Sequence, residues 1–208
     1  MRKLVLLIPL SLALFCSLVQ GQILAPILQG APAGGGTMTC GQTDFSSGSQ
    51  SNLANYILWT PCKTGANGAG YTLTTLQVYY STIGTSKQFY TALYTDKTSS
   101  CPLSQGHCPN TPVCDDATGV TLTLINSLNT DTPTGCGTLS ANTIYWIETV
   151  VNDAAPGVGK GTSTACSNAV GFNSSYYVLG TAGTWPNPAT GLSTGATCYT
   201  IQALLTGN

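Results

Sequence analysis

The chain has 208 residues, of which only six are Lys or Arg and seven are Asp or Glu. A basic start, an apolar run over residues 4–19 and a small residue at Gly21 are typical of a secretory signal peptide covering residues 1–21. The remaining chain has four lysines, no arginine and no second apolar stretch of about 20 residues, which argues against nucleic-acid binding and against a membrane span after signal cleavage.

The predicted mature chain begins with an apolar, uncharged segment, residues 22–30 (QILAPILQG), followed by a small-residue linker, residues 31–36 (APAGGG). An apolar strand on a flexible linker is suited to insertion into the sheet of a neighbouring subunit. The alternative is that the segment folds back as the first strand of its own sheet. The side chains predicted to enter a neighbour are Ile23, Leu24, Ile27 and Leu28.

Residues 37–208 are rich in Thr, Ser, Gly and Tyr, which favours strands and turns over helices. Leu76, Val78 and Tyr80 alternate with polar neighbours at the period of a strand. Together these features predict one domain, an all-β single antiparallel β-sandwich with an N-terminal strand extension. The expected strands are residues 55–60, 71–80, 88–95, 120–125, 143–151, 175–179 and 198–205.

Eight cysteines follow the signal peptide, which in an exported chain indicates an oxidising compartment and up to four disulfide bonds. The spacing does not fix their pairing. The expected disulfide cysteines are Cys40, Cys62, Cys101, Cys108, Cys114, Cys136, Cys166 and Cys198.

No catalytic or cofactor-binding pattern is evident, so the sequence predicts neither an enzyme nor a bound cofactor or metal. His107 is the only histidine, and we interpret it as a solvated loop residue, not as part of a hydrolase triad or a zinc site. Glu148 lies within a predicted strand and is expected to be half-buried and structural. Asp115 and Asp116 are expected to be solvated turn residues, in preference to calcium ligands.

Aromatic and neutral polar residues suggest a second possibility, a sugar-binding surface. Trp185, which precedes Pro186 and Pro188 in a loop, is the first candidate for glycan contact, with Tyr176 and Tyr177. The simpler interpretation is that Trp59 and Trp146 are core residues and that Trp185 covers one end of the sandwich.

Three pieces of sequence resemble secreted bacterial and phage-associated jelly-roll modules: residues 76–84, 89–102 and 139–151. In such modules a strand ending in a Tyr-x-Asp turn precedes a strand of the type Leu-x-Ala-x-Thr-x-Tyr-Trp. The resemblance covers about half of the mature chain and implies the fold, with no catalytic residue. The layout of the N-terminal extension is similar to that of the donor strands of bacterial pilins.

The sequence therefore predicts a secreted, extracellular or cell-surface protein that assembles with copies of itself. The expected product is a pilus-like fibre formed head to tail by N-terminal strand insertion. The alternative is a secreted carbohydrate-binding or adhesive module whose partners are glycans.

Overall fold

The computed structural model describes residues 36–42, 47–50, 56–82, 87–102, 106–152, 157–160, 175–195, 198–199 and 201–208. Every pair of strands in these ranges is antiparallel. The strands are β1 (Thr37–Gly41), β2 (Ser47–Gln50), β3 (Tyr56–Lys63), β4 (Tyr71–Thr82), β5 (Gln88–Lys97), β6 (Cys108–Asp115), β7 (Val120–Thr121), β8 (Ser127–Asp131), β9 (Thr138–Leu139), β10 (Ile144–Val151), β11 (Gly157–Lys160), β12 (Ser175–Leu179), β13 (Ser193–Gly195) and β14 (Ile201–Gly207).

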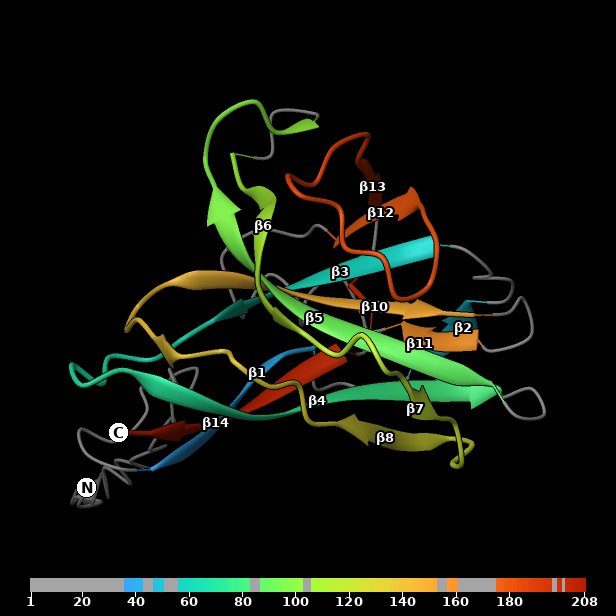
Figure 1. Ribbon diagram of the computed structural model, residues 1–208, viewed down its shortest axis with the longest axis horizontal. Helices are drawn as coiled ribbons and strands as arrows, with labels where there is room; N and C mark the ends of the chain where they lie inside the picture. Colours follow the sequence, from blue (N-terminus) through green and yellow to red (C-terminus); the bar gives the residue numbers. More distant parts are fainter. Residues whose placement is uncertain are drawn as a thin grey trace, which may run out of the picture.

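These strands form two facing sheets, and Figure 1 shows the two layers. Sheet A has the order β1-β14-β4-β11-β2, with β8 and β9 also paired to β4. Sheet B has the order β13-β12-β3-β10-β5-β6, with β7 also paired to β5. The predicted all-β antiparallel sandwich is therefore confirmed.

Strand β4 shows how the sequence pattern produces the core. Leu76, Val78 and Tyr80 are buried between the sheets, whereas the intervening Gln77 and Tyr79 are partly exposed. Successive strand residues point to opposite faces, so period-two apolar residues fill one side of the sheet. The alternation predicted for residues 71–80 is confirmed.

Most predicted strands have slightly different bounds in the structure, and hydrogen bonds accompany two of the differences. The strand expected over residues 120–125 ends at Thr121, because the Asn129 side-chain oxygen accepts the backbone N–H groups of Thr123 and Leu124 and draws them out of the ladder. The strand expected to begin at Cys198 begins instead at Ile201, after a bend in which the Tyr199 carbonyl accepts a hydrogen bond from Thr60.

Sheet B also carries a second apolar cluster on the face that points away from sheet A. We call this cluster the outer aromatic layer. The tryptophans Trp59 and Trp146, predicted as core residues, are both buried, but they lie in this layer and not between the sheets. Its buried members are Ile57, Trp59, Ala92, Tyr94, Cys108, Trp146, Val150, Tyr176 and Ala189.

Two disulfides connect the sheets on opposite sides of the sandwich. Cys40 of β1 is bonded to Cys62 of β3, and Cys114 of β6 is bonded to Cys136, which lies between β8 and β9. Because β14 and β8 pair with overlapping parts of β4, they flank it on opposite sides, and the two bonds therefore clamp both sides of the core.

Disulfide bonding is confirmed for the cysteines that the structure describes. Cys101 and Cys108 form a third bond, and Cys198 is also disulfide-bonded. Cys166 lies outside the described residues. None of the described segments is a helix of the length and hydrophobicity needed to cross a membrane.

Candidate functional site

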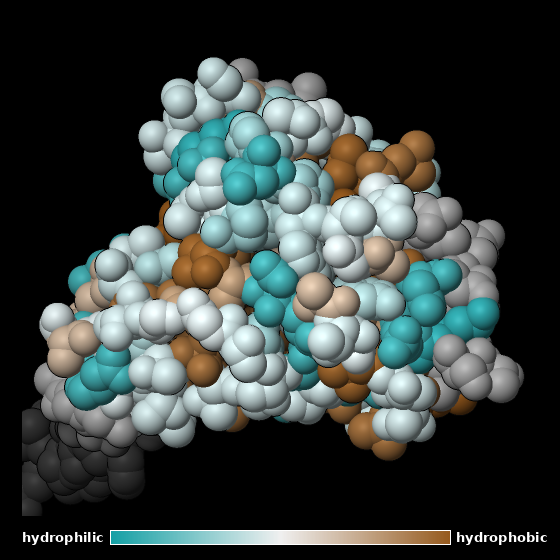
Figure 2. Space-filling view, in the orientation of Figure 1, coloured by the Kyte–Doolittle hydropathy of each residue, from teal (hydrophilic) through white to brown (hydrophobic). Residues whose placement is uncertain are grey.

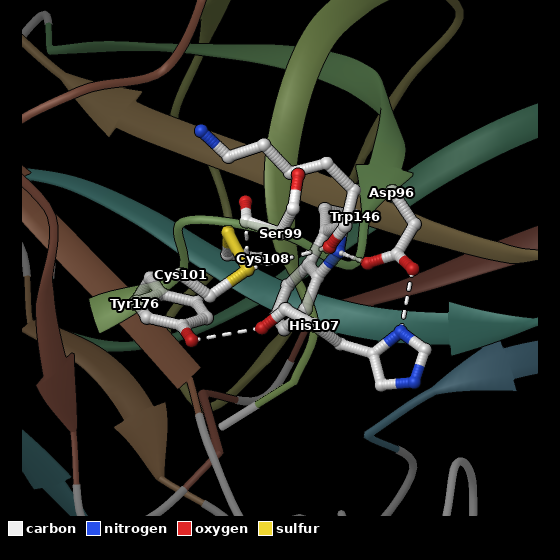
Figure 3. Close-up of a disulfide and its surroundings, with 8 residues drawn as sticks. Asp96, Ser99, Cys101, His107, Cys108, Trp146 and Tyr176 are labelled. Atoms are coloured by element: carbon white, nitrogen blue, oxygen red, sulfur yellow. Dashed lines mark hydrogen bonds and ion pairs between the residues drawn. A yellow bond between two sulfur atoms is a disulfide. The ribbon is translucent and has the colours of Figure 1, made fainter. Parts of the chain in front are cut away.

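The most elaborate side-chain cluster lies where the loop between β5 and β6 folds over the outer aromatic layer (Figure 3). The Cys101–Cys108 disulfide closes this loop across a separation of seven residues. The loop that follows β12 is tied to the same region, because the Ala189 N–H donates to the Asn110 carbonyl over 2.7 Å. Two loops that are distant in sequence therefore cover one face of sheet B.

Asp96, near the end of β5, is the centre of this cluster. Its Oδ1 accepts a hydrogen bond from Trp146 Nε1 at 2.8 Å, and its Oδ2 lies 2.6 Å from His107 Nδ1. The Tyr176 hydroxyl donates to the His107 carbonyl at 2.8 Å. Figure 3 shows these contacts beside the disulfide. Sequence reasoning missed Asp96, although the Tyr-x-Asp strand ending and the Tyr-Trp pair of the resemblance contain both partners of the Asp96–Trp146 bond.

The interpretation of His107 as a solvated loop residue is only partly right, because the residue lies in a loop but its side chain is paired. Its side chain is 34% exposed and is bonded to Asp96, which is 12% exposed. The carboxylate accepts, so we assign the imidazole proton to Nδ1. Such a carboxylate–imidazole pair fixes the orientation of the His107 ring. The two nearby cysteines, Cys101 and Cys108, form a disulfide and therefore cannot serve as nucleophiles or zinc ligands.

Glu148 lies deeper in the outer aromatic layer and is fully buried, not half-buried as predicted. In the sheet register it faces Trp59 on β3 and Ala92 on β5. Burial raises the pKa of the Glu148 carboxyl well above its ordinary value, and the approach of Tyr94 and Trp59 only partly opposes this rise. No contact to either carboxyl oxygen meets hydrogen-bond geometry within the described part of the chain.

Asp131 is a second buried carboxyl group, but it belongs to β8 of sheet A and reaches the inner face of sheet B. Its Oδ2 accepts a hydrogen bond from the Thr91 hydroxyl. Burial raises the pKa of Asp131 to about 6, and the neighbouring Asp116 carboxylate adds to the rise.

The pair Asp115 and Asp116 is only partly the solvated turn that was predicted. Asp115 is the last residue of β6 and pairs with Ala92. Asp116 lies in a turn, where its Oδ1 accepts hydrogen bonds from the backbone and hydroxyl of Thr118. Within the described ranges, no group of three or more His, Cys, Asp or Glu side chains is arranged to hold a metal ion.

The three residues predicted for glycan contact do not form one surface. Tyr176 is fully buried, so its ring cannot stack on a sugar. Tyr177 points to the opposite face of its strand, where it packs edge-on against Tyr56 at 5.8 Å between ring centroids. Trp185 is partly buried against the outer aromatic layer, so it covers a face of sheet B and not an end of the sandwich.

The residues predicted for subunit contact, Ile23, Leu24, Ile27 and Leu28, lie outside the described residues, and their role stays a prediction. The structure does describe the strand that follows them. Strand β1 begins at Thr37, one residue after the predicted linker, and pairs with β14. Among the described residues it has no partner on its other side, so β1 is an edge of sheet A.

Comparison with known proteins gives no match to any family model, curated protein or solved structure.

Proposed function

We propose that the protein is a secreted structural subunit that forms an extracellular filament by inserting residues 22–30 into the sheet of a neighbouring copy. The observation that supports this most directly is that the strands from β1 onward already enclose a core, while an apolar segment precedes them on a short linker. Core residues such as Leu76, Ile147 and Ile201 have no exposed surface. An apolar segment that its own domain does not need is available to a partner.

The energetics require more than the apolar side chains of the segment. Burial of Ile23, Leu24, Ile27 and Leu28 contributes at most about 12 kcal/mol. Ordering nine backbone residues costs about 9 to 18 kcal/mol. Main-chain hydrogen bonds to the acceptor sheet, and a second contact between the domains, are therefore part of the proposal.

The surface of the domain is compatible with close contact between copies. Figure 2 shows a face that is mostly of intermediate hydropathy, with separate hydrophobic and hydrophilic areas. Long-range electrostatic repulsion between copies is weak, because the whole chain has only six Lys or Arg and seven Asp or Glu residues. Among the described residues, the exposed large hydrophobic side chains are aliphatic: Leu124, Ile125 and Leu179.

The same exposure pattern weakens the glycan-binding alternative. A sugar platform uses the flat face of an accessible aromatic ring. None of the large hydrophobic residues classed as exposed in the described ranges is aromatic, and Tyr176 is buried. Trp185 remains the residue to test: Trp185→Ala should abolish retention on a polysaccharide column if the glycan alternative is right, and unchanged retention would eliminate Trp185 as the platform.

The proposal is tested by negative-stain electron microscopy of residues 22–208, produced in an oxidising compartment, beside residues 37–208. Filaments are expected only from the longer protein. Two variants of the full-length mature chain test whether the apolar side chains of the segment are needed. Ile27→Asp with Leu28→Asp should prevent assembly. Gln22→Asp with Gln29→Asp adds the same charge without removing an apolar side chain, and it should reduce assembly less. Filaments of equal length and number from residues 37–208 would refute strand donation.

A further inference from the structure

We propose that the outer edge of β1 is the site that receives residues 22–30 of a second copy. This inference rests on the proposed function and adds the acceptor site, which that function leaves open.

The hydrogen bonds at the two ends of β1 show which of its main-chain groups face outward. The Gly207 N–H donates to the Gly36 carbonyl, and the Gln42 N–H donates to the Ile201 carbonyl, both over 2.9 Å. Positions 36 and 42 therefore face β14, and antiparallel pairing alternates from one residue to the next. The N–H and C=O groups of Thr37 and Thr39 consequently point away from β14, as a strand template requires.

The other sheet edges are poorer templates. On sheet B, β6 contains Pro109 and Pro112, which have no N–H, and its pairing with β5 is interrupted by two register shifts. Strand β13, at the opposite edge of sheet B, has three residues, and β9 on sheet A has two. Strand β2, at the far end of sheet A, has four residues, and its pairing with β11 contains a register shift. Beside β8, the Asn129 side chain binds the backbone of residues 123 and 124 and folds that segment back onto the strand.

Pro26 sets the orientation of the donated strand. Because it has no N–H, its main chain must face away from β1. The alternation then makes Ile23, Ala25 and Ile27 the residues that pair with the outward groups of β1. For an antiparallel addition, Leu24 and Leu28 fall on the same face as Met38 and Cys40, which is the core side of sheet A.

This arrangement matches an incompletely covered part of the core. Met38 is only partly buried although it packs against the core between the sheets, whereas the next inward residue, Cys40, is buried. A strand added beside β1 places Leu24 or Leu28 next to Met38 and removes more of that apolar surface from water. We therefore expect Leu24 and Leu28 to matter more for assembly than Ile23 and Ile27.

The first test is Thr39→Pro in the protein of residues 22–208. Because the Thr39 N–H faces outward, the substitution removes a donor from the free edge and leaves the pairing with β14 intact. We expect the critical concentration for assembly to rise about tenfold or more, since one ladder bond is lost and the ring obstructs the edge. The control Thr39→Ala keeps the N–H and should assemble much more readily than Thr39→Pro.

The outcomes of this test separate the acceptor site from strand donation itself. If Thr39→Pro assembles as well as Thr39→Ala while residues 37–208 do not assemble, the β1 edge is wrong and the proposed function stands. If residues 37–208 assemble normally, both are wrong.

A second measurement does not depend on the folding of the proline variant. A photoactivatable residue is placed at position 39, and copies labelled with ¹⁴N and ¹⁵N are mixed before irradiation. Mass spectrometry should then find cross-links between position 39 of one isotope and residues 22–30 of the other. Cross-links only within one isotope would overturn the proposal, because they would show the segment folded back on its own β1.

Discussion

The two faces of sheet B are built differently, although the same strands supply both. On the inner face the buried polar groups are paired: the Tyr80 and Thr149 hydroxyls are 3.2 Å apart, and Thr91 is bonded to Asp131. On the outer face, Glu148, Trp59, Tyr94 and Trp185 supply five of the six buried side-chain polar atoms that have no hydrogen-bond partner among the described residues. Polar groups left unpaired in an apolar layer reduce stability, so the inner face carries more net stabilisation for the area it buries.

The outer aromatic layer is held in place differently from the core between the sheets. Its cover consists of loops and not of a second sheet. The loop between β5 and β6 is fixed by the Cys101–Cys108 bond and by the contacts of His107 with Asp96 and Tyr176. The loop after β12 is tied to β6 by the hydrogen bond from the Ala189 N–H to the Asn110 carbonyl. The cover of the outer face is therefore held by a few polar contacts and one covalent bond, whereas the cover of the inner face is a second hydrogen-bonded sheet.

The largest expected effect is that of Trp146→Ala, which removes a buried aromatic ring and one partner of Asp96. We expect the free energy of unfolding to fall by about 3 to 5 kcal/mol, measured by urea denaturation. Trp146→Phe keeps most of the packing and should cost about 1 to 3 kcal/mol for the unpaired carboxylate oxygen. If Trp146→Phe is as damaging as Trp146→Ala, packing is not the main contribution of this side chain.

The disulfides should rank next and should differ between the two faces. Cys114 and Cys136 are 22 residues apart, and replacing both by Ala should lower the free energy of unfolding by roughly 3 kcal/mol. Cys101 and Cys108 are 7 apart, and their replacement should cost roughly 2.5 kcal/mol. Limited proteolysis should cut the second variant first between β5 and β6. Early cleavage elsewhere would show that this bond does not hold the loop in place.

The two buried carboxyl groups predict that the protein is more stable in mild acid than at neutral pH. A raised pKa in the folded state gives stability that is complete below the unfolded pKa and is lost as pH rises through the folded pKa. For Asp131, raised from 3.8 to about 6, the loss between pH 4 and pH 7 is about 3 kcal/mol at most.

Denaturation curves between pH 4 and pH 9 measure this effect. Asp131→Asn should flatten the dependence up to about pH 6, and Glu148→Gln should flatten it at higher pH, because burial raises its pKa further. If the free energy of unfolding of the unmodified protein increases from pH 4 to pH 7, the prediction for both buried carboxyl groups is wrong.

The smallest effect is expected for Trp185→Ala. The ring is only partly buried, and its Nε1 has no partner among the described residues, so its removal loses some packing and no hydrogen bond. We expect a loss of about 1 to 2 kcal/mol of unfolding free energy, measured by the same denaturation method. A larger loss would mean that the outer aromatic layer depends on this loop more than on Asp96.

Sequence reasoning located most of the longer strands. Residues 71–80 were located because a half-buried strand imposes period two, and residues 175–179, which are rich in Tyr and Val, are also a strand in the structure although their burial does not alternate. Strand β6 was missed because CPNTPVCD contains two prolines and no regular alternation. Its position depends on pairing with β5 and on two disulfides, which are contacts between residues distant in sequence.

The candidate site was harder to predict than the fold. The contact of Asp96 with Trp146 spans 50 residues, and no local pattern indicates it. The complete burial of Glu148 and Tyr176 follows from the loops that cover sheet B, and a strand pattern alone cannot show that both faces are covered.

The Cys40–Cys62 bond has a mechanical consequence for a protein loaded through its N-terminus. A pull on the chain ahead of Thr37 can peel β1 from β14 only as far as Cys40, because the bond there transfers the force directly to β3 in the facing sheet. The chain between Cys40 and Cys62 lies inside a covalent loop and cannot lengthen under this load. The extension available before the sandwich itself must break is therefore limited to the few residues ahead of Cys40.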